Sequence, residues 1–79
     1  MNLELKPSLT SMRINNLIRG KGLRQKEVAL AIGMSQQLFS AKMNDKFVFT
    51  VKDLAALADF FHVSVDYLMG RSDSDGGSE

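Results

Sequence analysis

The sequence predicts an all-α fold, a bundle of five short helices. Apolar side chains recur at helical spacing in five separate segments, and no stretch alternates between apolar and polar residues for long enough to indicate a strand. A serine or threonine precedes most of these segments and a glycine follows several, and these residue types begin and end helices. The 79 residues contain no cysteine, so packed helices rather than disulfide bonds must stabilise the domain.

The first helix is expected to begin between residues 8 and 11, where hydroxyl side chains can cap it. Its apolar residues share one face: Ile14, Leu17 and Ile18. Gly20 and Gly22 should end it, because glycine tolerates the left-handed conformation that stops a helix. Residues 1–7, which end at Pro7, are predicted to be an N-terminal arm.

The second helix is expected over residues 24–32, with Gly33 after it. Val28, Ala31 and Ile32 share one face of it, and Ala29 is small enough for close helix approach. Ser35 can cap a third helix that runs to about residue 44. Phe39 and Met43 are four residues apart on the inner side of that helix.

The fourth helix should follow a loop over residues 45–49, with Thr50 as its cap and Asp53 three positions later in a variant of the capping box. Its apolar stripe consists of Leu54, Leu57, Ala58 and Phe61. Ser64 caps a short fifth helix that Gly70 ends, so the domain is predicted to span residues 8–70. Residues 71–79 are rich in serine, aspartate and glycine, which predicts a disordered tail or the start of a linker.

Charge is unevenly distributed along the chain, although the net charge is only +1. Residues 1–52 hold nine lysines and arginines against three acidic residues, and residues 53–79 hold one arginine against six acidic residues. A basic half can bind phosphate groups, so nucleic acid is one class of partner. Ordinary scatter of charge would produce the same imbalance, and charge alone leaves the two readings open.

Several other classes of function are disfavoured. Without cysteine and with His62 as the single histidine, the chain offers neither a thiol nucleophile nor a multi-histidine metal site, so we expect no enzyme, no metal and no cofactor. No window approaches the roughly 18 apolar residues of a membrane span. The first residues lack the order of a signal peptide, and we therefore expect a cytoplasmic protein.

The most informative segment is residues 23–40, LRQKEVALAIGMSQQLFS. Two short helices flank a tight turn, and the second opens with polar side chains, as in a helix-turn-helix whose second helix enters the major groove. Ala29 is small where the two helices would cross, and Gly33 can supply the positive φ of the turn. Ser35 would cap the second helix and leave its first amides near phosphate.

This segment resembles the Cro/C1-type helix-turn-helix family, which includes the repressors of lambdoid phages. The residues that match the family pattern occur in its order: Leu23, Gln25, Val28, Ala29, Ile32, Gly33, Met34 and Ser35. Upstream, Arg13, Ile14 and Leu17 match its first helix, and residues 63–68 resemble its closing helix. The resemblance covers about residues 10–70 and implies a lambda-repressor-like DNA-binding domain, a sequence-specific phage or prophage repressor that binds a palindromic operator as a homodimer.

The resemblance also implies which side chains contact double-stranded DNA. Candidate base contacts are Gln36, Gln37, Ser40 and Ala41. Glutamine can form two hydrogen bonds with adenine, whereas alanine could contact only a thymine methyl group. Candidate phosphate contacts are Gln25, Ser35, Arg13, Asn44 and Lys46, with Arg24, Lys26 and Lys42 as further ones. A dimer contact is expected near Phe47 and Val48, which could form an exposed apolar patch.

Two departures from the family pattern stand near the end of the third helix. Lys42 occupies a position that is usually apolar, with Met43 expected to replace it in the core, and Asp45 stands where a glycine is usual. An alternative function also remains open, because antitoxins and some phage regulators use this fold to bind another protein. Such a protein-interaction module would depend on a surface such as Phe47 and Val48 rather than on glutamines and basic side chains.

Overall fold

In a computed structural model of the chain, residues 8–73 are described, and they form five α-helices and no strand. The helices are α1 (Leu9–Gly20), α2 (Gln25–Ala31), α3 (Gln36–Met43), α4 (Val51–Phe61) and α5 (Val65–Met69). The all-α, five-helix prediction is therefore confirmed. The predicted arm over residues 1–7 and most of the predicted tail lie outside the described residues.

Hydroxyl side chains begin four of the five helices, as the sequence predicts. Ser8, Ser35, Thr50 and Ser64 each have extended backbone angles and accept a hydrogen bond from the backbone N–H three residues later. Thr50 and Asp53 complete a capping box at α4, since the Asp53 carboxylate accepts from the Thr50 N–H at 2.9 Å. These bonds satisfy amides that the helices themselves leave unpaired.

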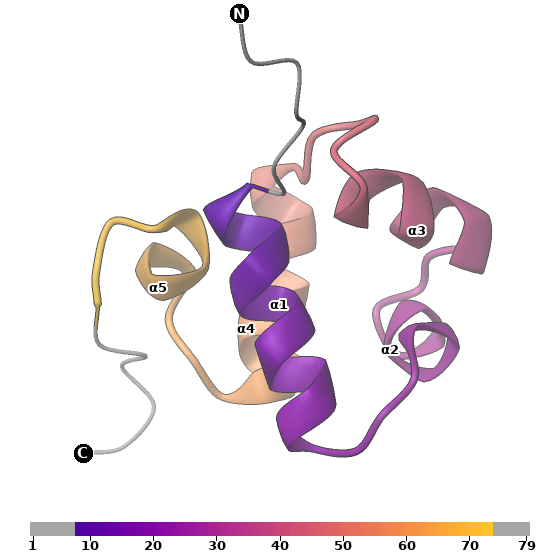
Figure 1. The fold of residues 1–79 in the computed structure, drawn as a ribbon, viewed down its shortest axis with the longest axis horizontal. Coiled ribbons are helices and arrows are strands. Elements are labelled where there is room, and N and C mark those ends of the chain that lie inside the picture. The colour runs from indigo at the N-terminus through magenta and orange to yellow at the C-terminus, as the bar shows by residue number, and fades with distance from the viewer. Residues whose placement is uncertain (1–7, 74–79) are drawn as a thin grey trace, which may run out of the picture.

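Other helices lie on both sides of the long helix α1. Figure 1 shows α5 on one side of α1, with α2 and α3 on the other. Helix α5 packs against both α1 and α4, whereas α3 packs chiefly against α2. The α2–α3 unit is thus held mainly through its inner side chains, and the opposite face of α3 is left uncovered.

A single apolar cluster joins the five helices. The largest fully buried side chains are Phe39, Ile14, Leu57, Leu68 and Val28. Phe49, in the loop before α4, is also buried and packs edge-on against Phe39 with 6.0 Å between the ring centroids. Burial of this kind contributes about 25 cal/mol for each Å² of apolar surface removed from water.

Candidate nucleic-acid interface

The turn between α2 and α3 fixes how these two helices cross. Gly33 has φ +74°, a conformation that a residue with a Cβ adopts only with strain. The Met34 N–H donates to the Ala29 carbonyl at 2.9 Å and closes the turn. Val28 and Ala29 are completely buried, so α3 can approach the inner face of α2 closely.

Helix α3 presents its polar first turn to solvent. The Ser35 Oγ accepts from the Leu38 N–H at 3.1 Å, so Gln36 and Gln37 become the first two helical residues. Both glutamines are exposed, and their amides form no hydrogen bond within residues 8–73. Their donors and acceptors are therefore available to a ligand.

The outer face of α3 forms a shallow hollow of about 460 Å³. The residues that line it are Gln36, Gln37, Ser40, Ala41, Asn44 and Lys46. All four residues expected to contact bases lie in this one hollow, together with two expected to contact phosphate. The Asn44 amide donates to the Ser40 carbonyl at 2.9 Å, which stabilises the last turn of α3.

A second, smaller hollow lies beside the first, between α1, the start of α2 and the end of α3. It is lined by Ser11, Met12, Asn15, Gln25, Met43 and Asn44. The fold therefore brings Gln25 and Asn44, which are 19 positions apart, to the same hollow. Asn15 is a further amide there that the sequence analysis missed, and its four-residue spacing from Ser11 on one helix face was the available signal.

Three basic side chains near these hollows remain unpaired. Arg24, Lys26 and Lys46 are exposed, and none takes part in an ion pair within residues 8–73. Glu27 forms no ion pair with them within residues 8–73. Its carboxylate accepts instead from the Arg24 backbone N–H at 2.8 Å and caps α2. The charge of these three groups is available for phosphate.

Two basic side chains expected at phosphates are turned into the protein instead. Lys42 is only 8% exposed, and its ammonium donates to the Asp53 carboxylate. Arg13 donates to the backbone carbonyls of Tyr67 and Ser72 at 2.5 and 2.6 Å and lies 4.2 Å from the centre of the Tyr67 ring. Because these groups already bind partners within the fold, Lys42 and Arg13 are poorer candidates for phosphate contacts than the exposed basic side chains. Met43 lies in the apolar core as expected, and Lys42 beside it is buried as well, as a charged side chain with a carboxylate partner.

Asp45 connects the end of α3 to the start of α1. Its φ is +62°, and its carboxylate accepts from the Ser8 N–H at 2.9 Å and from the Ser11 hydroxyl at 3.3 Å. The Ser8 backbone bond, more than the Ser8 and Ser11 side-chain bonds, lowers the pKa of Asp45 below its ordinary value. The carboxylate thus holds in place a left-handed residue where the family pattern has glycine.

Two other kinds of feature are absent from the described residues. No group of three or more metal-binding side chains occurs among residues 8–73. No helix in that range is long and apolar enough to cross a membrane. The exposed polar face of α3 is thus the most distinctive surface of the helix-turn-helix that the fold and its turn define.

A solved structure shares this fold. The chain is similar to the DNA-binding domain of the P22 C2 repressor (residues 1–76), determined by nuclear magnetic resonance. The two have 21% sequence identity and a TM-score of 0.72, and the match covers 94% of this chain and 100% of that one. No protein-family model and no curated protein matches the chain. The lambda-repressor-like fold predicted from the sequence is therefore confirmed at the level of structure.

Proposed function

We propose that this protein is a sequence-specific DNA-binding regulator of transcription, a phage or prophage repressor that reads DNA with α3. The observation that carries the proposal is the hollow over α3, where Gln36, Gln37, Ser40 and Ala41 come together on an uncovered helix face. A helix of this kind fits the major groove of B-DNA, in which every base pair presents a distinct pattern of donors and acceptors. The similarity to a repressor domain in fold supports this assignment.

The two glutamines would read bases because their amides are exposed at the first turn of α3. In helix-turn-helix proteins the N-terminal residues of the second helix contact base edges. A glutamine amide can donate to adenine N7 and accept from adenine N6, so adenine is the base that Gln36 and Gln37 would favour.

Polar groups around the reading face would bind the phosphate backbone and set its register. Gln25 and Asn44 share one hollow on one side of α3, and Ser35 caps α3. Exposed cations complete the set: Arg24, Lys26 and Lys46. Phosphate contacts of this type position a protein on DNA without choosing the sequence.

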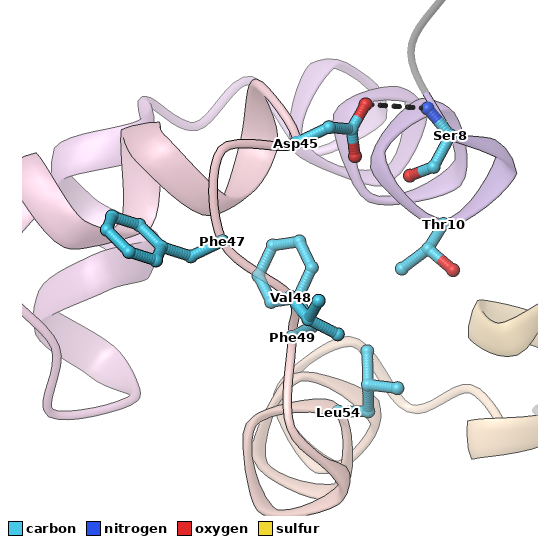
Figure 2. A pocket seen from close by; sticks show the side chains of 7 residues that line it. All are labelled: Ser8, Thr10, Asp45, Phe47, Val48, Phe49 and Leu54. Carbon is cyan, nitrogen blue, oxygen red and sulfur yellow. Dashed lines mark hydrogen bonds between the residues drawn. The ribbon is translucent and has the colours of Figure 1, made fainter.

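An apolar surface beside this region would join two copies on the DNA. Phe47 and Val48 are 60% and 84% exposed. They line a hollow of about 450 Å³ that Figure 2 shows, with the Phe47 side chain directed to the opposite side of the loop from Val48. Dimers of this class place two reading helices about 34 Å apart, one turn of DNA, on a near-palindromic operator.

The proposal is tested by selecting bound sequences from a random duplex library and measuring anisotropy of the selected duplex at several salt concentrations. We expect one sequence to bind well above the rest, with affinity that falls as salt releases counterions. Gln37→Ala should lose about 1–3 kcal/mol on that duplex but little on an unrelated one. The matched control is Asn16→Ala, which removes an exposed amide from α1.

If no sequence is enriched and Gln37→Ala binds as the parent does, the proposal is wrong. The exposed Phe47 and Val48 would then direct attention to a protein partner, as in an antitoxin. The dimer is tested separately, by the stoichiometry of the complex. Val48→Ser should leave half-site binding unchanged but weaken the cooperative binding of a second copy.

A further inference from the structure

A partly buried ion pair connects the proposed reading helix to α4. The Lys42 side chain is 10% exposed and the Asp53 side chain 16% exposed, and the Lys42 ammonium donates to Asp53 Oδ2. The same carboxylate oxygen accepts from the Thr50 N–H at 2.9 Å. One oxygen therefore caps α4 and holds the last turn of α3.

Other contacts also hold the C-terminal half of α3, since Met43 is buried and the Asp45 carboxylate accepts from Ser8 and Ser11. Helix α3 packs chiefly against α2, and within residues 8–73 the Lys42–Asp53 pair is the hydrogen bond that joins α3 to α4. Phe39 is fully buried in the middle of α3 and contacts Phe49 in the loop before α4. Apolar packing limits the tilt and roll of a helix without specifying one angle, and Lys42, close to one turn beyond Phe39, adds a directed bond to α4.

Stability alone gives a weak reason for such a pair. Removing two charges from water costs free energy that their attraction does not always recover, and apolar pairs of similar size are often as stable. A directed hydrogen bond differs from an apolar contact in specifying one geometry. Lys42 also follows Ala41 directly, so a change in its position moves the reading face.

We propose that the Lys42–Asp53 pair sets the angle of α3 relative to α4 and thereby positions Gln36 and Gln37 for base reading. The role in reading rests on the proposed function, but the role in helix orientation does not. Lys42 and Asp53 are positioning residues, and neither contacts DNA. This role would explain why a lysine stands where the resembled family has an apolar residue. The hydrogen bond from Lys42 to Asp53, and not packing alone, holds the last turn of α3 against α4.

The test is the double variant Lys42→Met/Asp53→Asn, which removes both charges and leaves the net charge unchanged. Methionine fills the space of the lysine stem, and asparagine can still accept from the Thr50 N–H. The matched control is Lys21→Met/Asp59→Asn, which removes two exposed charges that form no ion pair within residues 8–73. Asp53→Glu keeps a carboxylate at the capping position and should preserve the parent behaviour.

Two readouts separate positioning from simple stabilisation. Residual dipolar couplings of the free protein report the α3–α4 angle and its spread, and anisotropy reports the affinity ratio between the selected and an unrelated duplex. We expect a changed or broader angle in the double variant and a specificity ratio lower by about fivefold or more, as for one lost base contact. The control and Asp53→Glu should retain both parent values. If the double variant does not fold, Asp53→Asn alone is measured in the same way.

An unchanged angle and an unchanged specificity ratio would overturn the proposal. An equal loss of affinity on both duplexes in Lys42→Met, with a salt slope shallower by about one phosphate, would also overturn it, because Lys42 would then be a phosphate contact. If the parent binds no duplex selectively, the proposed function fails, and the α3–α4 angle still decides whether the pair orients the helix.

Discussion

Replacing Asp45 with asparagine, glycine and alanine separates its hydrogen bonds from its backbone conformation. Asp45 has a positive φ and accepts from the Ser8 N–H and the Ser11 hydroxyl. Asparagine keeps an acceptor and tolerates the left-handed region. Glycine loses the acceptor but removes the backbone strain, and alanine loses the acceptor and keeps the strain.

The expected order of stability is therefore parent, asparagine, glycine and alanine. The two hydrogen bonds of an exposed carboxylate contribute about 1 kcal/mol together, at the low end of the usual range. A left-handed alanine costs about 1 kcal/mol relative to glycine. We expect Asp45→Gly to lower the free energy of unfolding by about 1 kcal/mol and Asp45→Ala by about 2 kcal/mol, or about 4–8 °C and 8–16 °C in Tm.

Urea denaturation and thermal melting followed by circular dichroism would measure these differences. Asp59→Ala is the control, because it removes an exposed carboxylate from α4 and should change stability by less than about 0.5 kcal/mol. If Asp45→Gly is no more stable than Asp45→Ala, the left-handed conformation is wrong. If Asp45→Gly is as stable as the parent, the hydrogen bonds to α1 contribute nothing.

Three further predictions concern the carboxylates of Asp53 and Asp45, the side chain of Arg13, and the turn at Gly33. Partial burial raises the pKa of Asp53, but hydrogen bonds from Lys42 and Thr50 outweigh it, and the pKa values of Asp53 and Asp45 both lie below 3.8. The contribution of these two carboxylates to stability is thus full above pH 3.8 and is lost as the pH falls through their lower pKa values in the folded state. Between pH 7 and pH 2, the urea midpoint should therefore fall less for Asp45→Asn than for the parent. An equal fall of the midpoint in both proteins would contradict this. Arg13→Leu should lower the free energy of unfolding by about 1.5–3 kcal/mol without changing the DNA affinity of the folded protein. Weaker DNA binding at unchanged stability would instead indicate that Arg13 contacts phosphate. Gly33→Ala should cost about 1 kcal/mol in urea denaturation, because its φ is +74°, and an unchanged midpoint would argue against that turn geometry.

The sequence predicts the features of this fold that depend on neighbouring residues. Ser35 and Ser64 cap their helices because each bond reaches only three residues along the chain. The clustering of Gln36, Gln37, Ser40 and Ala41 also follows from the spacing of one helix face. Local rules are sufficient at these positions, and the structure agrees with them.

Contacts between distant parts of the chain could not be predicted in this way. Lys42 and Arg13 are basic residues of the kind that bind phosphate. Only the tertiary fold shows that Lys42 binds Asp53, 11 positions away, and that Arg13 binds Tyr67, 54 positions away. Long side chains with charged ends can turn inward or outward from the same helix position. The sequence identifies them as basic, and the partner that they bind is decided by the packing of other helices.

The contacts of Arg13 also determine where another protein can be fused to this one. Arg13 holds the Ser72 carbonyl at 2.6 Å and pairs with Asp73 at 3.4 Å, so the last described residues lie against α1. In Figure 1 that end of the chain is on the α5 side, away from α3. A fluorescent protein joined directly after Asp73 would start on the side opposite the helix that we propose to read DNA. Fusion at this position is therefore the arrangement that should permit imaging without obstructing α3.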